Sequence, residues 1–156
     1  MPIDKSLAEL TKLAATLEQE SEDLNALIES LEKQLEGCKI GVSVWLDEVL
    51  EEECTVEARD ARMVTVHEGW VIGYARAADA WRIAAKRCRA TVTEEEGDAP
   101  DSTVWSDVTA PIPLADAPRT VRVEAATLFE ALLEALRHRV QQSIESIQKA
   151  KKLVAK

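Results

Sequence analysis

Two tryptophans, a tyrosine and an arginine form the group of residues with the clearest chemical potential. Trp70 and Tyr74 lie four residues apart in an alternating segment, and Arg76 and Trp81 follow them. If the two segments pair as strands, Arg76 lies opposite Trp81 and the aromatic rings share one face. Such a face suits a planar or anionic ligand, and it also suits an ordinary hydrophobic layer beneath a helix. A small-molecule site at these four residues is therefore one candidate function.

Other reactive residue types do not converge on a catalytic or metal-binding pattern. The cysteines Cys38, Cys54 and Cys88 are widely spaced, and the two histidines lie in different segments. Acidic clusters at 47–53 and 94–101 lack the spacing of an EF-hand loop, and zinc, P-loop and Rossmann signatures are missing from the sequence. We therefore predict reduced thiols, no metal, no cofactor and no enzymatic activity.

Composition predicts a single soluble domain, residues 1–156, in the cytoplasm. The chain is 46% hydrophobic, 31% charged and 4% aromatic. Its net charge of −10 disfavours nucleic acid and anionic membrane surfaces as partners. No apolar run approaches the roughly 18 to 20 residues that cross a bilayer. The same acidity supports another candidate function, an inhibitor that occupies a basic partner.

Long helices are predicted at both ends of the chain. Residues 3–36 and 119–156 contain no glycine or proline, the residues that break helices. The second helix is expected over 117–156, either unbroken or as a short helix followed by a long one from about 128. The first helix has a five-heptad apolar pattern, in which leucine recurs at every seventh residue, at Leu10, Leu17, Leu24 and Leu31.

The middle of the chain, residues 38–93, is predicted to form an antiparallel sheet of three to four strands. Val and Trp residues alternate with polar ones there, and a hairpin turn is expected at Ala78 and Asp79. The apolar pattern changes face after Lys86, which predicts a bulge. An acidic, proline-containing loop over 94–116 follows. The expected strands span about 40–50, 62–68, 69–77 and 81–93.

Together these elements predict an α+β fold in which the two helices pair as an antiparallel coiled coil or helical bundle. Charge agrees with this pairing. Residues 3–36 carry nine acids and three bases, net −6, and residues 121–156 carry four acids and seven bases, net +3. The order of helix, β hairpins and helix resembles the plan of prefoldin-type chaperone subunits, which implies paired helices, although here the middle segment holds nearly all of the aromatic residues.

Both helices carry more apolar residues than one seam can bury. We therefore predict an interaction or assembly protein that forms a homo-oligomer, with a dimer favoured, or binds a partner protein. Periodicity does not distinguish pairing within a subunit from pairing between subunits. The predicted interaction residues, on the seam and beside it, are Leu10, Leu13, Leu17, Leu24, Leu27, Leu31, Leu128, Leu132, Leu136 and Ile144.

Overall fold

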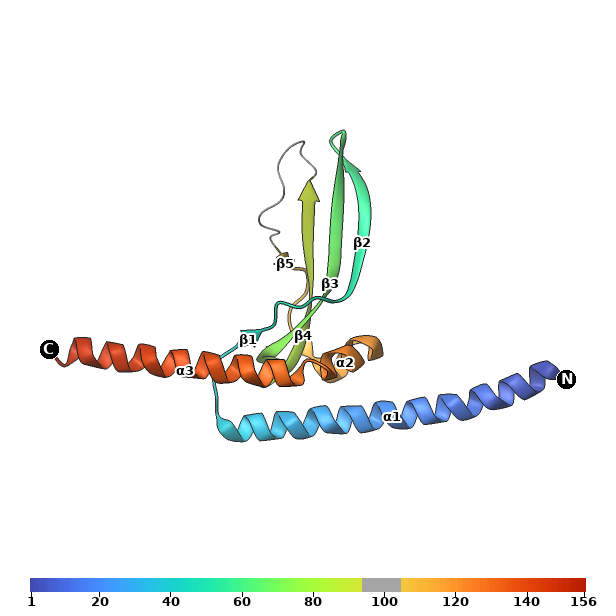
Figure 1. The fold of residues 1–156 in the computed structure, drawn as a ribbon, viewed down its shortest axis with the longest axis horizontal. Coiled ribbons are helices and arrows are strands. Elements are labelled where there is room, and N and C mark those ends of the chain that lie inside the picture. Colours follow the sequence, from blue (N-terminus) through green and yellow to red (C-terminus); the bar gives the residue numbers. More distant parts are fainter. Residues whose placement is uncertain (94–104) are drawn as a thin grey trace.

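Helices form the base of the molecule, and a long antiparallel sheet stands on them (Figure 1). The computed structural model describes residues 1–93 and 105–156. The predicted α+β class, with long helices at both ends of the chain, is confirmed. The elements are α1 (Pro2–Cys38), β1 (Val44–Trp45), β2 (Leu50–Arg59), β3 (Arg62–Ala77), β4 (Ala80–Thr93), β5 (Trp105–Asp107), β6 (Ile112–Pro113), the 3-10 turn η1 (Leu114–Asp116), α2 (Arg119–Ala126) and α3 (Phe129–Val154).

The β3–β4 hairpin is the centre of the sheet. Its register runs without a break from the pair Val64–Thr93 to the turn. Ala78 and Asp79 make that turn with φ angles of 50° and 63°. Positive φ at both central residues is the signature of a type I′ turn, whose twist matches that of the flanking strands. The predicted hairpin and its turn are therefore confirmed.

Shorter strands pair with both sides of this hairpin. The strand order is β1-β3-β4-β5, with β2 also beside β3 and β6 also beside β4, and every pair is antiparallel. Within the part of the chain that the structure describes, the sheet thus has six strands, more than the three to four predicted. Among the described residues, β2 pairs with β3 alone, so β2 forms an edge of the sheet.

Three of the predictions for the middle segment need correction. Residues 62–77 form one strand rather than two, and β2 occupies 50–59, where no strand was expected beyond residue 50. Only glycine fits at position 69 inside β3, because a Cβ atom there would collide with the side chain of Val49, which crosses the strand at close approach. Of the predicted loop 94–116, residues 94–104 lie outside the described residues, and the remainder contains β5, β6 and η1.

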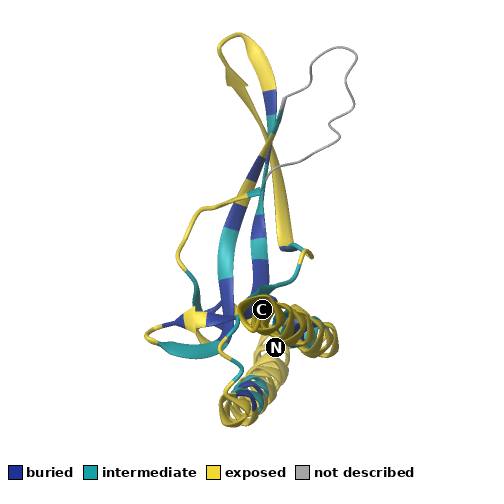
Figure 2. Ribbon diagram, turned by 90° about the vertical axis from the view of Figure 1, so that its left-hand side faces the viewer, coloured by how far each residue is buried: buried dark blue, intermediate teal, exposed yellow. Residues whose placement is uncertain are grey.

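One face of the sheet packs on the helices. Tyr74, Ile72 and Ile83 point to this side and are almost completely buried. Figure 2 shows that buried residues concentrate where the sheet meets the helices, whereas the helix ends and the β2–β3 tip are exposed. The helices and η1 contribute Ile28, Leu35, Leu114, Val121, Ala125, Leu132 and Leu136 to the same cluster.

The opposite face of the sheet is also covered, by the chain before β2 and by the Trp105 side chain, whose ring centroid lies 6.4 Å from that of His67. Cys88 and Ala90 are buried on this face, and Lys86 Nζ lies 4.1 Å from the centroid of the Trp45 ring. The strand stays in register through this region. The change of apolar face after Lys86 therefore reflects a second covered surface, and the predicted bulge is wrong.

The two long helices find their core partners in the sheet and the short elements rather than in each other. α1 packs on β4, η1 and α2, and α3 packs on β1 and β3. In Figure 1 both helices run from right to left, displaced along their axes, so the predicted antiparallel pairing within the chain is not present. The C-terminal region is a short helix followed by a long one, which was one of the two predicted arrangements.

Candidate functional site

The first half of α1 extends beyond the body of the molecule. We name residues 2–23 the α1 arm; none of them is buried, and residues 1–20 are all exposed. The arm continues the heptad pattern whose second half packs into the core. No other part of the described chain covers its apolar side chains, which are Ile3, Leu7, Leu10, Leu13 and Leu17.

The last half of α3 extends in the same manner from the other end of the body (Figure 1). We name residues 137–156 the α3 arm, and it likewise contains no buried residue. Leu132 and Leu136, just before it, are in the core. The exposed large apolar residues of this arm are Ile144, Ile147, Leu153 and Val154.

Three hydroxyl groups on the α1 arm donate hydrogen bonds within the helix. Thr11 Oγ1 donates to the Leu7 carbonyl at 2.8 Å, and Ser21 Oγ donates to the Leu17 carbonyl at 2.7 Å. Its leucines, in contrast, face water. Because most helical stability in proteins comes from packing an apolar face, the arm gains stability when a partner surface covers that face.

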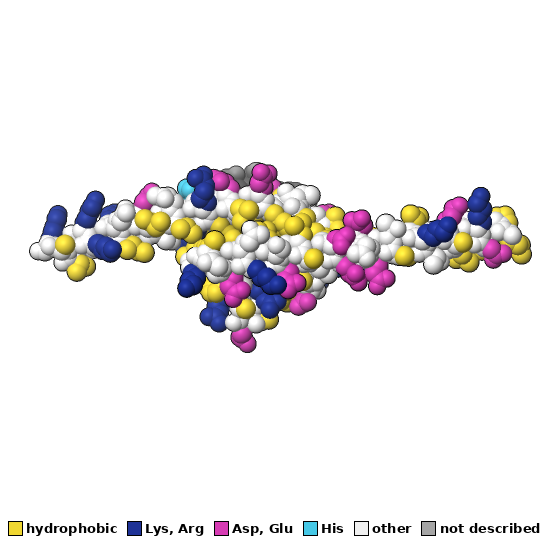
Figure 3. Space-filling view, turned by 90° about the horizontal axis from the view of Figure 1, so that it is seen from below, with side chains coloured by type: hydrophobic (Ala, Val, Ile, Leu, Met, Phe, Trp, Pro, Cys, Tyr) yellow, Lys and Arg dark blue, Asp and Glu magenta, His cyan; other side chains and the backbone are white. Residues whose placement is uncertain are grey.

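The two arms carry opposite charge. The α1 arm has six acids and two bases, net −4, and the α3 arm has one acid and six bases, net +5. Figure 3 shows basic side chains gathered at the α3 end and a band of apolar side chains along the middle of the face seen from below. The surface that these helices present is thus apolar along its length and electrostatically polarised.

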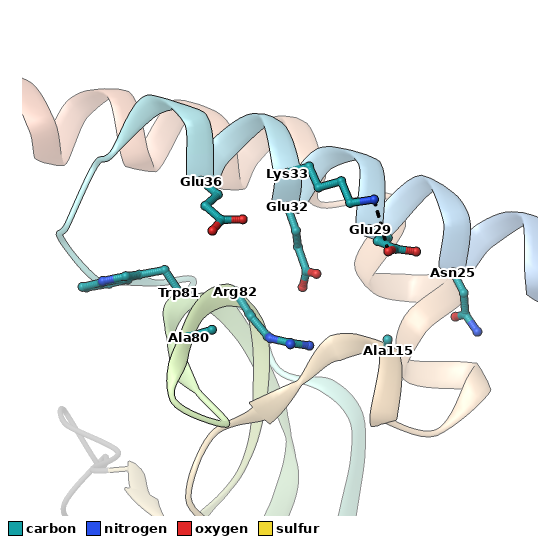
Figure 4. Close-up of a pocket in the computed structure, with 9 residues that line it drawn as sticks. All are labelled: Asn25, Glu29, Glu32, Lys33, Glu36, Ala80, Trp81, Arg82 and Ala115. Carbon is teal, nitrogen blue, oxygen red and sulfur yellow. Dashed lines mark ion pairs between the residues drawn. The ribbon is translucent and has the colours of Figure 1, made fainter.

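A second candidate region is a cleft of about 400 Å³ between α1 and the β3–β4 turn. Figure 4 shows Glu32 and Glu36 reaching from α1 toward the turn, where Trp81 and Arg82 line the opposite wall. Acids outnumber bases among the lining residues, since Glu29 also belongs to them. The cleft therefore favours a positively charged or neutral hydrogen-bonding group over an anion.

Glu32 is the most constrained side chain of this cleft. The backbone N–H of Ile83 donates to its carboxylate, which fastens α1 to β4. Its Oε1 atom is buried and has no hydrogen-bond partner. Burial raises the pKa of the Glu32 carboxyl, and the Arg82 guanidinium opposes this rise. Sequence reasoning missed this residue, because one glutamate on an acidic helix carries no distinguishing signal.

The residues predicted as a ligand face are divided by the structure. Tyr74 is 1% exposed and stacks on Trp81 with ring centroids 5.6 Å apart, and Trp70 packs at the margin of the core. Arg76 lies opposite Trp81 in the register, as predicted, and its Nη2 donates to the Asp79 carbonyl at 3.3 Å. Only Trp81 of the four reaches the cleft.

The predicted interaction residues are divided as well. Five of them belong to the packed body, in the core or at its margin: Leu24, Leu31, Leu128, Leu132 and Leu136. The other five are exposed and available to a partner: Leu10, Leu13, Leu17, Leu27 and Ile144.

The described residues contain neither a metal-binding cluster nor a membrane-spanning helix. Within residues 1–93 and 105–156, no three His, Cys, Asp or Glu side chains converge to hold a metal ion. Over the same residues, no helix is both long and apolar enough to span a membrane. Cys38 and Cys54 are exposed free thiols, whereas Cys88 is buried and its Sγ donates to the Gly69 carbonyl at 3.6 Å.

No protein-family model matches the chain, and neither a curated protein nor a solved structure is significantly similar to it. The basis for a functional proposal is therefore the geometry and charge of the chain itself.

Proposed function

We propose that this protein is an assembly module that forms homo-oligomers by burying its two helix arms in coiled-coil contacts. The observation that carries this proposal is that one heptad stripe runs the whole length of α1 but is covered by its own chain only in the second half. A stripe of this kind predicts a facing helix. In the α1 arm that facing helix comes from another copy.

The free energy of burying the exposed apolar side chains of the arm favours association over a helix left uncovered in water. Burying one leucine or isoleucine side chain stabilises a complex by about 1.5 to 3 kcal/mol. The α1 arm alone offers five such side chains, each between 49% and 69% exposed. Even after the cost of bringing two chains together, contacts of this size support a dissociation constant in the micromolar range or below, as an order-of-magnitude estimate.

Solution mass across a dilution series tests this proposal. Light scattering is expected to give a species larger than the 17.2 kDa monomer, and the double substitution Leu10→Asp with Leu17→Asp should weaken assembly about a hundredfold. Ala8→Asp with Ala15→Asp adds the same charge on the side of the arm away from the stripe and serves as the control. A wild-type chain that stays monomeric at high micromolar concentration, or equal effects of the two double substitutions, would contradict the proposal.

The cleft beneath α1 favours a second candidate function, binding of a small cationic or amine-bearing molecule. The specific observation is the buried and unpartnered Oε1 of Glu32 in a cleft that Trp81 also lines. Tryptophan fluorescence should respond when arginine methyl ester or putrescine is titrated into the protein. The response should disappear in Trp81→Leu and weaken in Glu32→Gln, and a flat titration of the wild-type protein would exclude these ligands.

A further inference from the structure

Charge selects which helix covers the α1 arm. Two α1 arms brought together place −4 beside −4, and two α3 arms place +5 beside +5. An α1 arm beside an α3 arm is the combination that brings opposite charges together. Like charges aligned along an interface oppose association, whereas complementary charges both accelerate it and fix the register.

The fold prevents this combination within one chain. The arms leave the body at opposite ends (Figure 1), so an α1 arm meets an α3 arm only if a second copy supplies it. Both helices run in the same direction in one copy. A two-fold rotation about an axis perpendicular to the helices reverses the direction of the second copy, which makes the α1–α3 contact antiparallel and forms it twice. Such a contact closes on itself as a dimer.

Charge positions along the arms favour this antiparallel alignment. With the bases of the two arms side by side, Asp4 lies beside Lys156 and Glu9 beside Lys151, and Glu20 lies one residue away from the position opposite Arg139. The same alignment sets exposed apolar side chains against each other, namely Leu7 against Leu153 and Leu13 against Ile147.

A parallel, head-to-tail alignment is less favourable. With the tip of the α1 arm at the base of the α3 arm, residue 2 lies beside residue 137, so Leu10 lies beside Glu145 and Leu17 lies beside Lys152. Charged side chains set against these two leucines weaken the apolar contact, and the arrangement also leaves an unpaired arm at each end of a growing chain.

We infer that the partner of each α1 arm is the α3 arm of a second copy, aligned antiparallel in a two-fold dimer with two such pairs. This inference rests on the proposed self-assembly. It names the facing helix, its direction and the stoichiometry, none of which follows from assembly alone.

Charge reversal tests the identity of the facing helix. One variant carries Asp4→Lys, Glu9→Lys, Glu20→Lys and Glu22→Lys, and the other carries Arg139→Glu, Lys151→Glu, Lys152→Glu and Lys156→Glu. Each variant alone should lose self-association by about a hundredfold or more at low salt, because all its arms then have one sign. Mixed together they should form a 1:1 heterodimer, and all eight substitutions in one chain should restore the homodimer.

The outcomes separate this inference from the proposed function. A monomeric wild-type protein overturns both. A wild-type oligomer that depends on Leu10 and Leu17, but whose reversed variants neither dissociate alone nor form a heterodimer when mixed, overturns the α1–α3 pairing and leaves self-assembly standing. Circular dichroism of each reversed variant confirms that the arms remain helical where association is lost.

Cysteine cross-linking tests the direction. In a background with Cys38→Ser and Cys54→Ser, Leu7→Cys and Leu153→Cys in the same chain should give a disulfide-linked dimer on mild oxidation. Leu7→Cys with Gln142→Cys, the pair that the parallel alignment brings together, should not. The reverse pattern identifies the parallel alignment and overturns the inference, and Leu7→Cys alone reports on contact between two α1 arms.

Discussion

The two halves of α1 share one pattern and meet different environments. Leu35 is 6% exposed in the half that packs on the sheet, whereas Leu7, at the same position of the heptad, is 54% exposed in the α1 arm. The pattern therefore specifies that a face has to be covered, and the length of the body decides how much of it the same chain covers. α3 repeats this division, with Leu132 in the core and Ile147 exposed.

The largest expected effect separates these two leucines. Leu35→Ala should lower the free energy of unfolding by about 2 to 4 kcal/mol, because it leaves a cavity in the core. Leu7→Ala removes the same atoms from the exposed half and should change the stability of the isolated monomer by less than about 0.5 kcal/mol. Urea unfolding followed by tryptophan fluorescence at low protein concentration measures both, and equal losses would break the comparison.

Amide exchange should show the same boundary along the helix. Residues 24–38 should stay protected at every protein concentration because they belong to the packed body. Residues 2–23 should lose protection by about a hundredfold on dilution to the monomer, because local opening of an uncovered helix costs little. Hydrogen exchange with mass spectrometry at two concentrations measures this, and concentration-independent protection of the arm would argue against a partner copy.

The two hairpin turns allow a comparison of the packed body with the exposed tip, with a smaller expected effect on stability. Ala78, in the turn beside α1, and Ala61, in the turn at the exposed tip, both have positive φ, 50° and 63°. Glycine relieves the strain of this conformation. Ala78→Gly should raise stability by about 0.5 to 1 kcal/mol in thermal melts, and Ala61→Gly should raise it less because the tip frays before the core unfolds. A larger gain at Ala61 would contradict this order.

The smallest expected effect concerns pH and Glu32. Burial holds its folded-state pKa above the ordinary 4.5, so folding favours the protonated form. That contribution is fully present below pH 4.5 and is lost as pH rises through the folded-state pKa. Glu32→Gln should therefore gain stability relative to the wild type between pH 4 and pH 7. Urea midpoints at both values measure it, with Glu29→Gln as the control, and a difference independent of pH would contradict the burial argument.

The fold was predictable where local patterns are self-consistent. Alternation of apolar residues on either side of Ala78 and Asp79 was sufficient to fix the β3–β4 register. The absence of glycine and proline located both helical regions, but it did not decide between one C-terminal helix and a short helix followed by a long one. β2 was missed because nearly all of its side chains are exposed, so it carries no alternating pattern.

The arrangement of the helices could not be predicted from the same information. Opposite net charges favour a pair of helices whether the two belong to one chain or to two. The periodicity of apolar residues does not distinguish these two cases either. Only the displacement of α1 relative to α3 along the base resolves which residues stay uncovered. The cleft also could not be predicted from the sequence, because Glu32 and Arg82 are brought together by the packing of α1 on the end of the hairpin.

The outer edge of β2 has a consequence for colloidal behaviour. An unpaired strand edge is a template for amyloid-like stacking, and natural proteins protect such edges with charge. β2 carries Glu51, Glu52, Glu53 and Glu57 along its ten residues. Repulsion between these carboxylates on two copies makes edge-to-edge pairing of their β2 strands unfavourable at neutral pH. We therefore expect the long hairpin to resist aggregation even though the helix arms expose apolar side chains.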